Sequence, residues 1–292
     1  MKKSVLKIVG LALFFLVYNL IQAYAQKHEE SFNRMAKFSE NAKKRVFVLE
    51  NVNGHVTVEG YQGNDVKMEI DKRITGDSDS DVEEGKRDIK FVVEEKGDTI
   101  YVYIDSPYMM RKRHKGKSWW SWNNHHEVDY AFNFDIKVKA PSNIDLSVHT
   151  INHGDVKVKG IYAENLRASN VNGDVILEDI TGKTKATTVN GVVKASYKEN
   201  PPENSKYSTI NGDITIHYRK NLSAHLGFKS MHGEFFTEFD VSGYLPSKVD
   251  KQHDKSGTVR FVVNKYTGVT VGKGDVSYKF ETLNGNIYIK KH

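Results

Sequence analysis

The chain has 292 residues, of which 38% are hydrophobic and 27% charged, with a formal net charge of +6. This length fits one large domain or two small ones. The absence of cysteine excludes disulfide bonds, thiolate metal sites and a bacterial lipoprotein anchor.

Residues 1–25 have the pattern of a secretory signal peptide. A basic MKKSVLK is followed by 14 apolar residues, IVGLALFFLVYNLI, and by AYA, a small-x-small cleavage site. This run is short for a membrane-spanning helix, although an uncleaved anchor is the alternative. Three lysines would leave with the segment, so the mature chain would carry +3, too little to indicate a nucleic-acid partner. We expect a soluble, exported protein of the periplasm or cell surface, with no transmembrane segment.

Residues 26–45 form a lead segment, and a strand-rich front section follows over residues 46–140. Its runs of alternating polarity, such as VFVLENVNGHVTVEG and DIKFVVEEKGDTIYVYI, predict β-strands. Lys96-Gly97-Asp98 between two runs predicts a hairpin turn. We expect antiparallel strands that lead into or cap the repeats described below. The polar residues 75–88 are expected to form a mobile loop.

Residues 107–127, PYMMRKRHKGKSWWSWNNHHE, hold all three tryptophans of the chain beside five basic residues. Because the flanking strands are expected to pair, this segment should project as a long hairpin or loop. The tryptophans could stack on sugar rings or sit at a membrane interface. Alternatively, they fold back and cover an apolar flank of the sheet. The candidate binding residues are Trp119, Trp120, Trp122, Arg111 and Arg113.

A histidine-rich stretch near this segment is a possible metal-binding group. It comprises His114, His125, His126, Glu127 and Asp129. Adjacent side chains on a strand point to opposite faces, and the spacing matches no established ligand set. We therefore predict no metal site.

One phrase recurs along the chain, as in STINGDITIHY, SNVNGDVIL, TTVNGVVKA and ETLNGNIYI. The alternation after each glycine predicts a short strand with one buried face, and Asn-Gly supplies the positive φ angles of a tight corner. Aligned on the glycine, the seven copies lie at Gly54, Gly154, Gly173, Gly191, Gly212, Gly233 and Gly285. Five of these glycines follow an asparagine, namely Asn53, Asn172, Asn190, Asn211 and Asn284.

Glycines 154 to 233 recur at intervals of 18 to 21 residues, a period that two architectures explain. In a parallel β-solenoid, each coil stacks on the next, which keeps equivalent positions apolar and aligns the asparagine amides in a ladder. In a meander of hairpins, each Asn-Gly pair closes a type I′ turn, which does not explain the constant register. We favour an all-β solenoid over residues 141–292, with the meander as the alternative.

The stretch KAPSNIDLSVHTINHGDVKVKG (residues 139–160) and the repeats after it resemble a bacterial family common in the Bacteroidetes. Members of this family are named "putative adhesins" and have β-helix-like repeats. The resemblance covers the chain from Val46 to its C-terminus. It implies a repeat fold and an adhesive role, and it brings no catalytic residues with it.

Asp155, Asp174 and Asp213 follow corner glycines and would line one edge of a solenoid. Such repeats can hold calcium, but other copies have valine, glutamate or asparagine here, so we expect each aspartate to stabilise its own turn. The acids are scattered over turns and do not form the paired carboxylates of a polysaccharide lyase or hydrolase. We expect no catalysis, cofactor or metal.

The sequence thus predicts an exported, non-catalytic protein of the cell envelope, acting as an adhesin or scaffold. Its partner would bind the solenoid face, where Ile176, Phe236 and Tyr288 add outward apolar groups that favour a protein, or the Trp-rich segment, which favours a glycan. The alternatives are a carbohydrate-active β-helix enzyme and a periplasmic regulatory or stress partner.

Overall fold

The computed structural model describes residues 26–107, 109–114, 117–122, 128–202, 204–245, 249–253, 259–263 and 266–292. The predicted signal peptide lies outside these residues. The chain divides into two compact units. The larger unit comprises Ser31–Lys72, Phe91–Asp105 and Asn133–His292, and the smaller one Met1–Glu30, Arg73–Lys90 and Ser106–Phe132.

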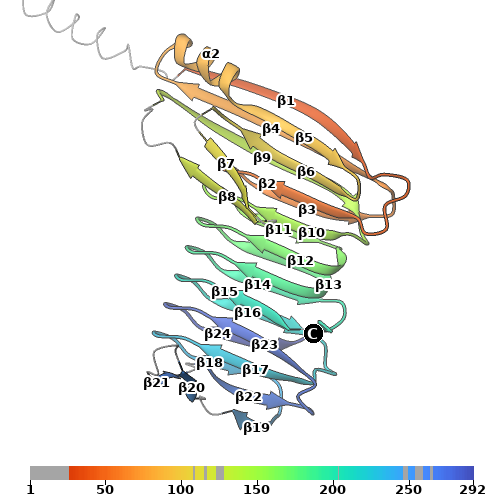
Figure 1. Ribbon diagram of the computed structural model, residues 1–292, viewed down its shortest axis with the longest axis vertical. Helices are drawn as coiled ribbons and strands as arrows, with labels where there is room; N and C mark the ends of the chain where they lie inside the picture. The colour runs from red at the N-terminus through yellow and green to blue at the C-terminus, as the bar shows by residue number, and fades with distance from the viewer. Residues whose placement is uncertain are drawn as a thin grey trace, which may run out of the picture. The chain divides into compact units, whose positions relative to one another are not determined.

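The larger unit is built from two sets of stacked parallel strands, which we call stack A and stack B (Figure 1). Every neighbouring pair in the following orders is parallel. Stack A runs in the order β9 (Tyr130–Pro141), β3 (Val56–Tyr61), β11 (Val156–Lys159), β13 (Val175–Thr187), β14 (Val193–Tyr197), β16 (Ile214–Tyr218), β24 (Ile287–Lys291) and β18 (Phe235–Thr237). Stack B runs in the order β6 (Thr99–Asp105), β2 (Val46–Glu50), β10 (Asp145–His149), β12 (Tyr162–Ser169), the second half of β13, β15 (Ser205–Ser208), β23 (Val276–Glu281) and β17 (Ala224–Lys229).

Each repeat is one passage from a stack B strand through the glycine corner to a stack A strand. Equivalent positions face one another, so that Val156 pairs with Val175 and Val175 with Val193. All three valines are 0% exposed, and burying each one contributes roughly 1.5–3 kcal/mol. The fold is therefore all-β, mostly parallel and solenoid-like. The hairpin meander, which needs antiparallel neighbours, does not describe these strands.

The stacking order of the repeats differs from their order in the chain. The last repeat, β23 and β24, pairs with β15 and β16 on one side. On its other side it pairs with β17 and β18, which precede it in the sequence. Figure 1 shows these C-terminal strands lying between the two earlier repeats.

The front section departs from the expected antiparallel arrangement. β2 and β3 continue the two stacks, with Val46 facing Asp145 and Val56 facing Val156 in parallel, so the prediction is wrong for these strands and for β6 and β9. The first repeat carries the same inward valines as the later ones and packs on them for the same reason. As predicted, a turn at Gly97–Asp98 joins β5 (Lys90–Lys96) to β6.

Antiparallel strands occur where stack B ends. β22 (Thr267–Val271) pairs with β17, and β19 (Val241–Leu245) pairs with β22. A two-stranded sheet of β20 (Val249–His253) and β21 (Val259–Val263) is also antiparallel. β1 (Gln26–Lys37) and β4 (Asp65–Gly76) complete the large sheet.

The smaller unit holds a helix where the sequence predicted a mobile loop. α2 spans Asp79–Asp88, and Ser78 caps it, because its hydroxyl accepts from Asp81 N while the Asp81 carboxylate accepts from Ser78 N. Val82 is buried on one side of the helix. The Ser-x-x-Asp capping pattern could have revealed this start. In the described ranges, no helix is long and apolar enough to cross a membrane.

Candidate functional site

The glycine corners carry an inner row of hydrogen bonds that the sequence analysis missed. Just before six of the seven corners, a buried or half-buried polar side chain donates to the carbonyl of a glycine in the neighbouring repeat, as Thr188 does to Gly173 (2.8 Å) and Thr209 to Gly191 (2.9 Å). The same bond recurs from Thr150, Asn170, Ser230 and Thr282. Each bond satisfies a carbonyl that the corner would otherwise bury without a partner. The recurring Thr, Asn or Ser at this position was the available signal.

The asparagine side chains form an outer ladder. Asn172 donates to Asn152 (2.7 Å), Asn190 to Asn172 (2.8 Å) and Asn211 to Asn190 (2.7 Å), each from Nδ2 to Oδ1. Asn284 continues the ladder by donating to Asn211 (2.7 Å). His232 ends it, with Nδ1 3.0 Å from the Asn284 amide oxygen. The backbone of Asn53 pairs with that of Asn152. The ladder stabilises the stacking of the repeats, and its amides are hydrogen-bonded to one another.

The aspartates after the corners bond to the next repeat. Asp155 accepts from the backbone N–H of Asp174 (3.0 Å), and Asp174 from that of Val192 (2.9 Å). Asp213 likewise accepts from Asn286 (2.7 Å). We expected each aspartate to stabilise its own turn. This prediction is wrong, because each carboxylate accepts a hydrogen bond from the backbone of the next repeat in the stack. Among the residues that the structure describes, no cluster of three metal-ligating side chains occurs.

The glycines are required mainly by close packing between repeats. A Cβ on Gly191 would lie 2.2 Å from the Gly173 carbonyl oxygen, and one on Gly212 would lie 2.0 Å from that of Gly191. Gly212 also has a positive φ of 152°. Gly191 is not among the positive-φ residues, so positive φ does not explain all of the corners.

The apolar residue two positions before each glycine becomes exposed in the last three stacked repeats. Val52 is 1% exposed, whereas Ile210 is 43%, Leu283 39% and Met231 68% exposed. These three are stacking neighbours, since Leu283 N donates to Ile210 O and His232 N to Leu283 O. We call them the apolar row. The corner turns these three side chains outward.

The outward face of stack A carries two aromatic rings on the same repeats. Phe236 and Tyr288 stack with ring centroids 5.1 Å apart and 9° between their planes. Phe236 is 42% exposed. Ile176 is half-buried on the same face. The outward apolar groups predicted from the sequence thus lie on the strand surface, with Phe236 and Tyr288 side by side.

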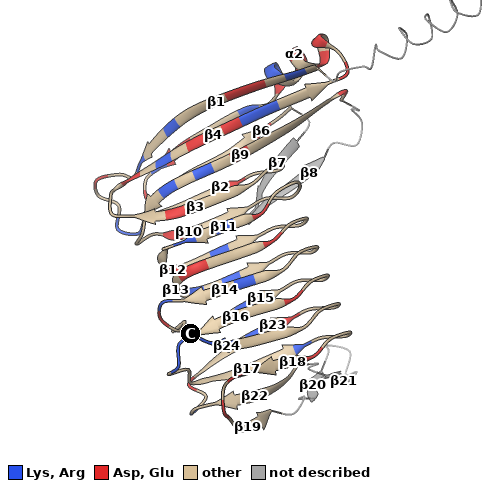
Figure 2. Cartoon of the chain, turned by 180° about the vertical axis from the view of Figure 1, so that it is seen from behind, with Lys and Arg blue, Asp and Glu red and all other residues tan. Residues whose placement is uncertain are grey.

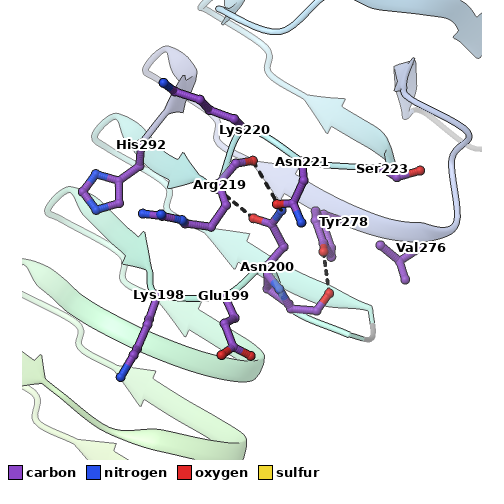
Figure 3. A pocket seen from close by; sticks show the side chains of 11 residues that line it. Lys198, Glu199, Asn200, Arg219, Lys220, Asn221, Ser223, Val276, Tyr278 and His292 are labelled. Atoms are coloured by element: carbon purple, nitrogen blue, oxygen red, sulfur yellow. Dashed lines mark hydrogen bonds between the residues drawn. The ribbon is translucent and has the colours of Figure 1, made fainter.

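A hollow of about 930 Å³ lies where β14, β16 and β24 end (Figure 3). Asn200 organises it by accepting from Arg219 N (2.8 Å) and donating to the Asn221 amide oxygen (3.2 Å). Among the lining residues, Glu199 is the only carboxylate. The basic residues of the lining are Lys198, Arg219, Lys220 and His292. This chemistry suits the holding of an anion.

The Trp-rich segment forms the predicted hairpin. β7 (Met109–His114) pairs antiparallel with β8 (Lys117–Trp122), and the backbones of Arg111 and Trp120 face one another. The side chains of Trp119, Trp120, Trp122, Arg111 and Arg113 lie outside the described part, as do His125, His126 and Glu127. Whether these tryptophans bind or pack stays a prediction.

The model of the Toastrack DUF4097 family matches residues 133–290, more than half of the chain. The chain belongs to this family. This agrees with the expected resemblance to a bacterial family of unknown function with a repeated β-fold, whereas the adhesive role stays a prediction. The Toastrack match begins within β9 and leaves out β2 and β3, although these two strands pair in register with β10 and β11.

Solved structures similar to this Toastrack chain include a "putative cell adhesion protein" of Clostridium sporogenes, with 14% identity, a TM-score of 0.42 and coverage of 90% of this chain and 100% of that one. A "putative adhesin" of Bacteroides fragilis has 9% identity, a TM-score of 0.31 and coverage of 89% and 97%. A "putative lipid binding protein" of Parabacteroides distasonis has 11% identity, a TM-score of 0.23 and coverage of 90% and 97%. These scores are too low to carry a functional argument. A comparison with curated proteins found no match.

Proposed function

We propose that this Toastrack protein is an exported, non-catalytic binding protein of the cell envelope that acts as an adhesin or scaffold. The signal-peptide pattern of residues 1–25 supports export. The observation that carries the binding role is the group of exposed apolar side chains on the last three stacked repeats. Ile210, Leu283 and Met231 form the apolar row, and Phe236 and Tyr288 stack on the neighbouring face.

These side chains favour a protein partner. Single exposed apolar residues are ordinary on a protein surface, but stacked neighbours form a contiguous patch of the kind that marks interaction sites. Both groups sit on hydrogen-bonded strands and corners, so the patch is ordered before binding and little conformational entropy is lost there.

Protease treatment of intact cells tests the location. If the protein faces the exterior, added protease cleaves it while a periplasmic control protein stays intact. Cleavage only after the outer membrane is opened would instead assign it to the periplasm and exclude adhesion to a host or matrix. In that case the scaffold or regulatory role remains.

Paired variants test the surface. Met231→Ser with Phe236→Ser should abolish recovery of a cross-linked envelope partner, while Met35→Ser, at another residue that is 58% exposed, should leave recovery unchanged. Replacing Trp119, Trp120 and Trp122 by alanine should leave the protein partner bound. If the tryptophan variant alone loses binding, and the lost ligand is a glycan, the hairpin is the binding site instead.

A further inference from the structure

Four consecutive strands of stack B carry a cation at the same outward position. Arg167 on β12 faces Lys185 on β13, Lys185 faces Lys206 on β15, and Lys206 faces Lys279 on β23. We call these four residues the basic row; Figure 2 draws Lys and Arg in blue along the stacked strands. Arg167, Lys185 and Lys279 are exposed, and Lys206 is half-buried. Ser147 and Gly227 occupy the equivalent positions at the two ends.

This arrangement places like charges one strand spacing apart. Neighbouring strands lie about 4.7–4.9 Å apart, so the four cations span roughly 14 Å across the strands. Like charges directly opposite one another destabilise a sheet. Stack A follows the opposite rule, because Lys159 lies between Glu59 and Glu178 at equivalent outward positions. The basic row is therefore a local departure from charge alternation within one unit.

Among the described residues, only Lys206 of the row pairs with a carboxylate. The carboxylate of Glu281 pairs with Lys206 (3.2 Å) and Lys229 (2.7 Å). Lys279 lies over the ring of Tyr266, 5.6 Å from its centroid. In the part of the chain that the structure describes, neither Arg167 nor Lys185 forms an ion pair with a carboxylate. Two cations of the row are thus available to an external anion.

A row of hydroxyl groups runs beside the cations. Two positions further along the same strands lie Ser169, Thr187 and Ser208, which also face one another in register. The Ser169 hydroxyl forms a hydrogen bond with Nδ1 of His149 (2.8 Å). Hydroxyls can exchange hydrogen bonds with the hydroxyls of a sugar. The face thus pairs one charge with one hydroxyl in each of three successive strands.

We propose that the basic row binds a linear anionic polysaccharide with one acidic group per sugar, lying across the strands along the stack. The cations suit the acidic groups of such a chain, and the neighbouring row of hydroxyls can exchange hydrogen bonds with its sugar hydroxyls. An acidic peptide such as poly-L-glutamate offers the same charge without hydroxyl groups. This site is separate from the apolar row and the tryptophan hairpin, and it does not depend on the function proposed for them.

Binding of the full chain to polygalacturonate, which has one carboxylate per sugar, tests the proposal. Methyl-esterified polygalacturonate serves as the neutral ligand. At about 50 mM NaCl the wild-type protein should bind the acidic polymer and not the neutral one, and added salt should weaken binding. The triple variant Arg167→Gln, Lys185→Gln, Lys279→Gln should bind roughly 10- to 30-fold more weakly, since each exposed ion pair accounts for a factor of a few.

A charge-matched triple variant on stack A provides the control. Lys157→Gln, Lys159→Gln, Lys194→Gln removes the same net charge from outward positions and should change the affinity by less than about twofold. Equal loss in both variants would reduce the effect to net charge and overturn the proposal. Failure of the wild-type protein to bind, or equal binding of poly-L-glutamate or phosphatidylglycerol vesicles, would also overturn it.

Three further variants separate this result from folding and from the proposed protein partner. Single Arg167→Gln and Lys185→Gln variants should each weaken binding severalfold with unchanged melting temperatures, so a misfolded triple variant would leave the test intact. Met231→Ser with Phe236→Ser should bind the polysaccharide as the wild-type protein does. If that variant loses the polysaccharide as well, the basic row is not the separate site proposed here.

Discussion

At the scale of single residues, the corners show two distinct reasons for glycine. One is conformation, since a positive φ between about 20° and 160° strains any residue with a Cβ. The other is the carbonyl of the repeat below, which leaves no room for a methyl group. Three glycines separate these causes. Gly97 has a φ of 61° and open space, Gly191 has only the close contact, and Gly212 has both.

Alanine substitutions at these three positions should rank accordingly. Gly97→Ala should lower the free energy of unfolding by about 1 kcal/mol through φ strain. Gly191→Ala should cost about 1–3 kcal/mol because the neighbouring corner must move, and Gly212→Ala should cost more than either. Urea unfolding of the three variants measures the order. A loss near zero in Gly191→Ala would mean that the neighbouring corner relaxes without cost.

Glu281 couples stability to pH. Its carboxylate accepts from Lys229, Tyr266 and Lys206, and these contacts, the Lys229 hydrogen bond foremost, hold the pKa of Glu281 at about 2. The lowered pKa means that the stabilisation is complete above the ordinary glutamate pKa and is lost as the pH falls towards 2.

Glu281→Gln should therefore lower the free energy of unfolding at pH 7 by on the order of 1–2 kcal/mol, allowing for solvent screening of a partly exposed group. The difference from wild type should shrink as the pH falls from the ordinary glutamate pKa to about 2. Chemical unfolding across this range measures it. Glu178→Gln, at an exposed carboxylate of stack A, should show a much smaller change; a pH-independent deficit in Glu281→Gln would contradict the linkage.

At the scale of elements, the alternation of apolar and polar residues predicted where the strands lie, but not always the direction of the strands they pair with. Alternation identified the inward valines and the recurring asparagine predicted stacked amides, because both depend on local spacing. The antiparallel front section was wrong, since Val46 and Val56 have the same alternation whichever way their neighbours run. The exposure of Ile210 and Met231 was hidden for another reason. An apolar residue at a corner looks the same in sequence whether the corner turns it inward or outward.

Helix α2 was missed because its composition is polar and only one short stretch faces inward. Its cap gives a test. Ser78→Ala should reduce local helix stability by about 1 kcal/mol, because the Asp81 N–H loses its acceptor. Hydrogen exchange of the α2 amides should speed up accordingly. Ser80→Ala, a change within the first turn, should leave exchange unchanged or slower; equal acceleration by both would contradict the role of the cap.

At the scale of the whole molecule, the spacing of the repeats alone does not reveal that the last repeat lies inside the stack. The interval of 52 residues from Gly233 to Gly285 does not indicate which repeat the last copy stacks on. In the structure, Asn284 has ladder partners on both sides, whereas His232 has one. An asparagine amide both donates and accepts hydrogen bonds, so it can continue the ladder in both directions. A histidine at the equivalent position suits the end of the ladder. His232, in place of the recurring asparagine, was thus the signal in the sequence that this repeat ends the stack.

Removing residues 276–292 should therefore loosen a segment that comes earlier in the chain. Among the strands that the structure describes, β18 pairs with β24, and β17 pairs with β23 and β22. Hydrogen exchange in the shortened protein should show loss of protection in β17 and β18, while β11 to β14 stay protected. Retained protection in β17 and β18 would mean that these strands can dock on β15 and β16 directly.

The inserted repeat also sets the order in which the protein can be completed. Strands up to β16 can stack as they are synthesised, each on the one before. Until residues 276–292 are made, β18 lacks its partner β24, and β17 has β22 but not β23. The edge of β16 that β24 covers also stays open for that interval, so a chain that stops before these residues exposes unpaired strand edges. Residues 276–292 therefore complete the stacking of a segment that is made before them.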